Sequence, residues 1–384
     1  MRLLEYQGKQ LMANRGIVIP SGSMITSLQD LDGLEYPLFL KAQVPVGKRG
    51  KAGAIRIVSD VSEAVVVAEE LFRTTVGGYP VCVLLAEEPV GIQQELYLAV
   101  LIDKKINRPL VMASQAGGMD IEAVAKKSPE KFFKQYFGLH TGIQDFQLRY
   151  LAKSLDLEKP APFFDLVKQL ITLAREVDAT LLEINPLAIT SKGLVALDAK
   201  VILDDKAAYR QRGLFQHIME EQQKIDKREK SEAAQMAEAA NIQYIPLDGD
   251  IGIIADGAGT GMLTLDMVID AGGRAANFCE MGGQANAEYM EKAMAAILAN
   301  PQVKALVVSL IGGLTRMDEM AEGIVNYIKK TTESVPMVVR MCGTKADVGI
   351  SLLEKAGIKT FADLNQAIQE IIAKSREVSN DNSD

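Results

Sequence analysis

The spacing of apolar residues differs between the first and second parts of the chain. Up to about residue 210, short runs that alternate apolar and polar residues lie among segments whose apolar residues recur every three or four positions. The first pattern predicts half-buried strands and the second predicts amphipathic helices. Beyond Pro246, apolar runs of strand length alternate regularly with segments of helix length, which predicts a doubly wound parallel sheet. We therefore expect an α/β protein whose N-terminal part is of the α+β kind.

Turn residues place the predicted elements of the first part. Gly16 ends a helix at 5–15, because glycine takes the left-handed C-terminal position at little cost. Strand-like runs around polar turns predict one hairpin over 95–114 and a second over 179–203. The other predicted elements are strands at 36–44, 54–59 and 81–88, and helices at 60–75, 121–137 and 161–177.

A change of composition marks a boundary between domains. Within 211–241, the stretch EEQQKIDKREKSEAAQMAEAAN has almost no large apolar side chain, which is typical of a solvated helical linker. We expect an N-terminal region over 1–230, a linker at 231–245 and the doubly wound domain over 246–376. The strands of that domain are predicted at 251–256, 275–280, 303–311 and 336–341. The polar residues 377–384 are expected to fray.

Overall composition excludes several classes of protein. The 384 residues have a formal charge of -8 and are 48% hydrophobic, which is ordinary for a multi-domain enzyme and offers no basic field for nucleic acid or anionic membranes. The start has no apolar signal-peptide segment, and no run reaches the roughly 18 apolar residues of a membrane span. Three isolated cysteines form no CxxC pair, as expected of a reducing compartment. We expect a cytoplasmic protein without nucleic-acid or membrane partners.

A basic, glycine-rich segment is the first candidate for binding chemistry. Lys41 lies on a predicted strand, and the sequence GKRGKAG follows at 47–53. Glycines let backbone amides approach an oxyanion, and the lysines and Arg49 add positive charge, so the segment suits phosphate. It is not a P-loop, because the Gly-Lys-Ser/Thr ending is absent. A solvated basic turn is the alternative interpretation.

The second predicted hairpin brings polar side chains together. Glu183 and Asn185 point to one face of their strand, because side chains alternate. With the turn centred between residues 191 and 192, Asn185 falls opposite Asp198, where paired Cβ atoms lie about 4.5–5.5 Å apart. An amide oxygen and a carboxylate so placed can share one hard cation, and Mg²⁺ usually takes only one or two protein oxygens. The alternative is a polar outer face of the sheet.

Two glycine-rich turns at strand ends of the predicted parallel sheet are the third candidate. DGAGTGM at 256–262 and IGGLTRMD at 311–318 each lead into a helix, and helix N-termini bind anions through free amides and the macrodipole. Ligands of such sheets sit beyond the carboxyl ends of the strands. A dinucleotide fingerprint is the rival for the first turn, with Glu280 as its acid. Met262, however, stands where the third glycine belongs.

Several ordered motifs resemble one family. They are KAQV followed by RGKAG, QELYL at 94–98, MASQAGGMDIE at 112–122, LLEINPL with LDAK, DGAGTGM, NFCEMGG and IGGLTRMD. From residue 3 to about 372 the chain resembles the β subunit of succinyl-CoA synthetase, an ATP-grasp protein. The resemblance implies an ATP-grasp fold over 1–230 with an inserted subdomain at 17–97. A flavodoxin-like ligase domain would follow over 246–376.

The resemblance also implies roles for individual residues. Positions that bind the nucleotide are matched by Lys41, Lys48, Arg49, Gly50, Glu87, Val90 and Glu95. The magnesium ligands are matched by Asn185 and Asp198, and Glu183 matches a catalytic glutamate that receives a phosphohistidine from a partner. Positions that hold the carboxylate substrate are matched by Asp256, Gly313, Leu314 and Thr315.

An α subunit would complete such an enzyme. In the family it carries the phosphorylated histidine and most of the CoA site, in an αβ or α2β2 assembly, and no segment of this chain matches its histidine motif. The implied reaction joins succinate to CoA with Mg²⁺ and ATP, giving ADP and phosphate. Alternatives are the same chemistry on another carboxylate such as malate, a stand-alone ATP-grasp ligase acting on an amine, and a protein that binds ATP without turnover.

Two positions depart from the family pattern. Pro45-Val46-Gly47-Lys48-Arg49-Gly50 stands where the family usually has His-Ala-Gly-Gly-Arg-Gly, so the loop is stiffer and more basic. Asp256 stands where the family has asparagine. An ionised Asp256 would repel a dicarboxylate unless it is protonated or paired, for example with Arg316. A plain cap of the following turn is the alternative role.

Overall fold

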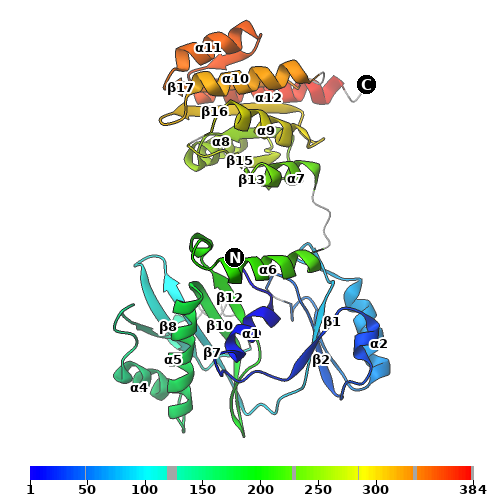
Figure 1. Ribbon diagram of the computed structural model, residues 1–384, viewed down its shortest axis with the longest axis vertical. Coiled ribbons are helices and arrows are strands. Elements are labelled where there is room, and N and C mark those ends of the chain that lie inside the picture. Colours follow the sequence, from blue (N-terminus) through cyan, green and yellow to red (C-terminus); the bar gives the residue numbers. More distant parts are fainter. Residues whose placement is uncertain (48, 119–127, 227–230, 284, 332–334, 382–384) are drawn as a thin grey trace. The chain divides into compact units, whose positions relative to one another are not determined.

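The structure is a computed structural model that describes residues 1–47, 49–118, 128–226, 231–283, 285–331 and 335–381 (Figure 1). The chain divides into two compact units, Met1–Arg228 and Glu229–Asp384. Within the described residues, no helix combines the length and apolar character needed to span a membrane. Each unit has a sheet-based core of its own, and the fold is of the α/β class that the sequence predicts.

A small antiparallel sheet forms one half of the first unit. Its strands, in spatial order, are β1 (Gly22–Ile25), β6 (Leu84–Glu87), β2 (Leu38–Ala42) and β3 (Ile55–Val58). Helix α2 (Val61–Phe72) shares a buried core with this sheet. Asp60 begins α2 by accepting a hydrogen bond from the Glu63 amide at 2.9 Å, which satisfies a free amide of the first turn. The half is completed by η1 (Leu28–Leu31), β4 (Thr75–Val76) and β5 (Tyr79–Pro80).

A larger antiparallel sheet forms the other half of the first unit. Its strands are β11 (Gly193–Ala196), β10 (Ala179–Thr190), β7 (Gln94–Asp103), β8 (Arg108–Ser114) and β9 (Phe133–Tyr136), and β12 (Lys200–Leu203) also pairs with β10. Helices α4 (Asp145–Ser154) and α5 (Ala161–Glu176) pack their buried apolar side chains into the core of this sheet. The other elements are α1 (Glu5–Ala13), η2 (Pro129–Lys131), η3 (Asp205–Ala207) and α6 (Arg212–Ile225).

Two predictions for this unit were wrong in part. The helix expected at 121–137 is absent from its described portion, where 133–136 form β9; residues 119–127 lie outside the described residues. Backbone pairing with the edge of β8, such as Val111 with Gln135, outweighs the local apolar spacing there. The insertion expected at 17–97 is shorter, because the small sheet ends at Glu87 and Gln94 already begins a strand of the large sheet.

The second unit is a six-stranded sheet. Its strands, in spatial order, are β13 (Gln243–Pro246), β15 (Asn277–Glu280), β14 (Ile251–Ala255), β16 (Ala305–Gly312), β17 (Met337–Gly343) and β18 (Lys359–Phe361). All neighbours pair in parallel except β13, which is antiparallel to β15. Counted along the chain from β14, the parallel strands follow the flavodoxin-like order 2-1-3-4-5. The predicted doubly wound sheet is confirmed.

Helices cover both faces of this sheet. Alternate residues of β16 divide between two cores, with Val308 in one and Val307 in the other. The first core is covered by α7 (Glu232–Ala239), α9 (Ala287–Leu298), α10 (Met317–Lys330) and α11 (Ala346–Lys355). The second is covered by α8 (Ala258–Asp270) and α12 (Leu364–Asp381).

The ends of the second unit differ from the sequence prediction. Residues 231–245 are not a linker, because α7 and β13 belong to this unit and Ala237 is buried in its core. Small alanine side chains pack closely against α9 without the large apolar residues that usually signal burial. The fraying predicted from residue 377 is wrong in part, since α12 continues to Asp381; residues 382–384 lie outside the described residues.

Candidate functional site

A cleft of about 1120 Å³ lies in the first unit and is lined by residues from both of its sheets. Lys48 lies outside the described residues. The lining includes the other residues of the first unit that the sequence suggests for nucleotide, metal or catalysis, namely Lys41, Arg49, Gly50, Glu87, Val90, Glu95, Glu183, Asn185 and Asp198. Side chains from distant parts of the sequence therefore face one space.

Apolar strand residues form part of the cleft wall. Ile55 and Ile57 contribute from β3, and Ile57 is 53% exposed although it is a large apolar side chain. Leu101 and Leu181 contribute from the large sheet, where they are direct cross-strand partners. The cleft thus combines apolar strand faces with charged groups, which is the usual composition of a small-molecule site.

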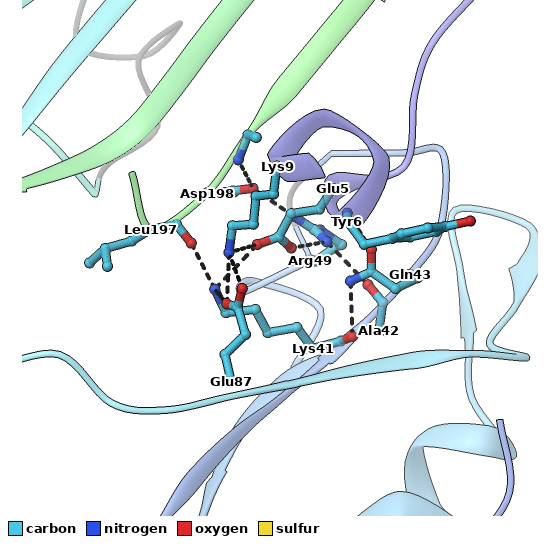
Figure 2. Close-up of polar contacts among 11 residues, drawn as sticks. Glu5, Tyr6, Lys9, Lys41, Ala42, Gln43, Arg49, Glu87, Leu197 and Asp198 are labelled. Atoms are coloured by element: carbon cyan, nitrogen blue, oxygen red, sulfur yellow. Dashed lines mark hydrogen bonds and ion pairs between the residues drawn. The ribbon is translucent and has the colours of Figure 1, made fainter. Parts of the chain in front are cut away.

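Six charged side chains form a buried ion cluster, and five of them line the cleft (Figure 2). The members are three cations and three carboxylates: Glu5, Lys9, Lys41, Arg49, Glu87 and Asp198. Helix α1 supplies Glu5 and Lys9, β2 supplies Lys41 and β6 supplies Glu87. The cluster thereby ties the N-terminal helix to the small sheet.

The two lysines of the cluster share the same carboxylates. Lys9 Nζ lies 2.5 Å and 2.7 Å from the two carboxylate oxygens of Glu87 and 2.8 Å from Glu5 Oε1. Lys41 Nζ lies 2.6 Å from Glu87 Oε2 and 3.2 Å from Glu5 Oε1, and it donates to the Leu197 carbonyl at 2.8 Å. The Lys9, Glu5 and Glu87 side chains are at most 3% exposed, so these pairs are desolvated.

Arg49 links the cluster to the second hairpin. Its Nη1 lies 2.6 Å from Glu5 Oε2, and its Nη2 donates to Asp198 Oδ1 at 3.0 Å. Burial alone would raise the pKa of Glu5, but the adjacent cations Arg49 and Lys9 outweigh it and hold that pKa well below its usual range. Burial alone would lower the pKa of Lys41, but the charges of Glu5 and Glu87 outweigh this effect and raise that pKa. Glu5 and Lys41 are therefore charged at neutral pH.

The second hairpin has the register that the sequence predicts. Leu187 pairs with Ala196 and Glu183 pairs with Lys200, so Asn185 and Asp198 stand opposite each other between the two ladders. Asn185 Oδ1 accepts from the Gly118 amide at 2.8 Å, and Asp198 Oδ1 accepts from the Ala199 amide at 2.7 Å.

Glu183 lies on the same side of β10 as Asn185 and also lines the cleft. The Lys200 ammonium lies 3.6 Å from its carboxylate, and the side chain is 16% exposed. Burial raises the pKa of Glu183, and Lys200 partly offsets this effect. Burial, followed by the Glu5 charge, also raises the pKa of Asp198, against the opposing effects of Arg49 and Lys41.

In the second unit, Asp256 follows β14 and is 6% exposed. Its carboxylate accepts a hydrogen bond from the Ile311 amide at 2.7 Å, which connects the two glycine-rich turns. Burial raises the pKa of Asp256, and the Ile311 hydrogen bond counteracts part of that shift. The pairing with Arg316 considered from the sequence is wrong, because Arg316 binds Asp318 at 2.7 Å.

The residues of the turn after β16 differ in exposure. Thr315 is buried at 4% exposure, whereas Gly313 is exposed and Leu314 is 87% exposed. The Gly313 carbonyl accepts from the Thr344 hydroxyl at 2.9 Å, so the β17–α11 connection supports the turn. Thr344 was not among the residues predicted from the sequence.

Glu5 and Lys9 were also missed from the sequence. They are four residues apart in a helix, a spacing that is usual for an exposed ion pair. The one available signal was that the family resemblance already begins at residue 3, because no local pattern distinguishes this pair from a surface pair.

Comparisons with known proteins agree with this architecture. The family model for an ATP-grasp domain matches residues 2–189, and the model for a CoA-ligase matches residues 254–373. The β subunit of the ADP-forming succinate–CoA ligase of Ignicoccus hospitalis is 39% identical, covering 97% of this chain and 98% of its own length. The same subunit from Aquifex aeolicus is 36% identical, covering 93% of this chain and 94% of its own length. The chain belongs to the succinate–CoA ligase β-subunit family.

Solved structures extend the comparison to the fold. ATP citrate lyase from Methanothrix soehngenii, bound to citrate and coenzyme A, matches with a TM-score of 0.69 and 19% identity, covering 94% of this chain and 95% of that one. At that identity the likeness concerns the fold alone. The ATP-grasp fold followed by a ligase domain, predicted from the sequence, is confirmed. In this β-subunit family member, the cleft lies in the unit that contains the ATP-grasp match.

Proposed function

We propose that this chain is the β subunit of an ATP- and Mg²⁺-dependent carboxylate–CoA ligase. The reaction is succinate, CoA and ATP giving succinyl-CoA, ADP and phosphate, by way of a phosphohistidine on a partner α subunit. The observation that carries the proposal is the cleft of the first unit. It sets the cations Lys41 and Arg49 beside the oxygen donors Asn185 and Asp198, in a chain whose relatives match over almost its whole length.

The nucleotide fits the cleft in two parts. The apolar strand residues, among them Ile57 and Leu181, offer surface for a base, and Lys41 with Arg49 offers charge for phosphates. Phosphoryl transfer depends on positioning and charge neutralisation more than on covalent chemistry by the protein. Lys41 and Arg49 are held in place by carboxylates before any ligand arrives, so they are oriented in advance.

The donor set of the hairpin fits magnesium. Among the described residues, no group of three or more His, Cys, Asp or Glu side chains forms a metal cage. An amide oxygen and a carboxylate at opposed positions are nevertheless sufficient for Mg²⁺, which keeps water and substrate phosphates in its other positions. Asn185 and Asp198 would hold the ion, which would supply charge neutralisation at the phosphates.

A partner subunit is needed for the remaining chemistry. The cleft is lined by neither His140 nor His217, which supports a phosphorylated histidine that comes from outside this chain. Glu183 faces the cleft beside the two metal-ligand candidates, where it can accept a hydrogen bond from an entering imidazole. We propose that the α subunit supplies this histidine and most of the CoA site, in an αβ or α2β2 assembly.

The carboxylate is held by the second unit in this proposal. Asp256 and the turn Gly313-Leu314-Thr315 lie beyond the carboxyl ends of β14 and β16, where ligands of open parallel sheets bind. Succinate is the leading substrate, and the buried Asp256 leaves malate or another carboxylate as the second candidate. A stand-alone ATP-grasp ligase would leave this whole unit without a role.

Co-purification with a partner from the native host tests the proposal, followed by CoA-dependent ATP consumption on a panel of carboxylic acids. Asp198→Asn and Asn185→Ala should each remove most Mg²⁺-dependent phosphorylation of the complex without unfolding it. Asp145→Asn is the matched control, because Asp145 is an exposed carboxylate of the same unit that pairs with Lys168 at 3.1 Å. Full phosphorylation in either cleft variant would refute the metal assignment.

A further inference from the structure

The turn that follows β8 contains two glycines whose Cβ positions are occupied, at Gly117 by backbone atoms and at Gly118 by the carboxylate end of Glu95. It belongs to the motif MASQAGGMDIE, to which the proposed function assigns no role. A Cβ on Gly117 would lie 2.6 Å from the backbone nitrogen and oxygen of Leu96. Gly118 has a φ of 69°, in the left-handed region that favours glycine. The turn therefore lies directly against β7.

Gly118 contacts two residues of the cleft that belong to different strands. Its amide donates to Asn185 Oδ1 on β10 at 2.8 Å. A Cβ on the same residue would lie 2.2 Å from Glu95 Oε2 and 3.2 Å from Glu95 Cδ, on β7. Gly118, Glu95 and Asn185 all line the cleft. One backbone position thus touches both a nucleotide-cleft candidate and a metal-ligand candidate.

We propose that Gly118 is a positioning residue for both of these side chains, an inference that rests on the proposed function. The oxygen of an asparagine side chain can accept a hydrogen bond from an N–H, whereas its nitrogen cannot. The Gly118 amide therefore fixes the orientation of the Asn185 side-chain amide, with Oδ1 toward Gly118. Oxygen is also the atom that a hard cation requires. The bare Cα of Gly118 meanwhile leaves room for the Glu95 carboxylate against the turn.

Gly118→Ala separates this role from ordinary backbone strain when it is compared with Gly142→Ala. Gly142 has a φ of 67° in the same unit, and a Cβ there would meet nothing within 4 Å. Both substitutions impose the same left-handed strain on alanine, and only the first one collides with Glu95. Thermal midpoints of the two full-length variants report the shared strain.

The decisive measurement is metal binding in the presence of ADP. Mn²⁺ binding to the full chain is followed by electron paramagnetic resonance, and the Mg²⁺ concentration for half-maximal activity is measured on the complex with the α subunit. We expect Gly118→Ala to weaken both by about 10-fold or more, as is typical when a group supporting a metal ligand is disturbed. Gly142→Ala should stay within about twofold of the wild type, because it has no contact in the cleft.

A double-mutant cycle with Glu95→Ala completes the test. Without the Glu95 side chain the overlap disappears, so adding Gly118→Ala to that background should cost no more than Gly142→Ala does. Should Gly118→Ala alone fail to fold, recovery of folded protein in the Glu95→Ala background is the expected result. Equal metal affinities for Gly118→Ala and Gly142→Ala would overturn the positioning role. Failure of the wild type to bind Mn²⁺ with ADP would instead overturn the proposed function.

Discussion

Replacing Lys9 by methionine should destabilise the first unit more than any surface charge change. The ammonium of Lys9 is almost fully buried and contacts Glu87 and Glu5 at 2.5–2.8 Å. Methionine keeps a similar length and volume but removes the charge. Glu5 and Glu87 would then share only Lys41 and Arg49, which already bind other carboxylate or carbonyl oxygens.

The magnitude follows from burial. Two unit charges about 4 Å apart interact by about 4 kcal/mol at an effective dielectric near 20. Removing one partner of a buried pair typically costs about 3–5 kcal/mol, because the remaining charge stays desolvated. For a unit of this size, about 2–4 °C of melting temperature corresponds to each kcal/mol, so the midpoint should fall by about 6–20 °C.

Differential scanning calorimetry of the full chain measures this shift. Lys168→Met is the matched control, because Lys168 pairs with Asp145 at 3.1 Å in the same unit but both side chains are more than half exposed. That pair should contribute about 0–1 kcal/mol. Combining Lys9→Met with Glu87→Gln should recover part of the lost stability, because the side chain at position 87 is then neutral and no longer needs the ammonium as its counter-ion. A Lys9→Met midpoint equal to that of Lys168→Met would refute the reasoning.

Three further predictions concern activity and pH. The purified chain alone should form no CoA ester, and adding its α subunit should restore turnover. CoA ester formation by the chain alone would contradict the assignment of the histidine and most of the CoA site to the α subunit. Asp256→Asn should raise kcat/KM for succinate relative to malate and the other acids of the panel, and an unchanged preference would exclude Asp256 from substrate choice. Because burial raises the pKa of Asp256 above 3.8, its stabilising contribution is present at low pH and is lost as the pH rises through the folded-state pKa. Asp256→Asn should therefore gain stability relative to the wild type as the pH rises above about 4, and a pH-independent difference in unfolding midpoints would contradict this.

The sequence predicted those parts of the fold that depend on local pattern. Buried parallel strands such as β14 and β16 are almost continuous apolar runs that lead into glycine-rich turns, so they could be located without a structure. The opposition of Asn185 and Asp198 followed from a strand period of two and a short polar turn, and the register agrees.

Features that depend on distant partners could not be predicted from pattern alone. Phe133–Tyr136 form a strand because they pair with the edge of β8. The four residues themselves give no indication that such an edge is nearby. Lys9 is a helical lysine whose burial is caused by Glu87, a residue of another element. Arg316 was a plausible partner for Asp256 until the structure placed Asp318 beside it. Alanine-rich α7 packs through small side chains, which composition does not distinguish from a solvated helix.

The equal numbers of positive and negative side chains in the buried ion cluster limit what the cleft can accept. The charges of Lys41 and Arg49 are already balanced by Glu5, Glu87 and Asp198. A bare triphosphate that bound these two cations would leave carboxylates of the cluster without a counter-ion, which is costly where they are buried. A nucleotide that arrives with its own divalent counter-ion makes a smaller demand, because the ion balances part of the phosphate charge. Under the proposed metal assignment, that ion would also give Asp198 a cation in place of Arg49. The charge balance of this largely buried cluster would thus select ligands by the charge of the whole complex rather than by its shape.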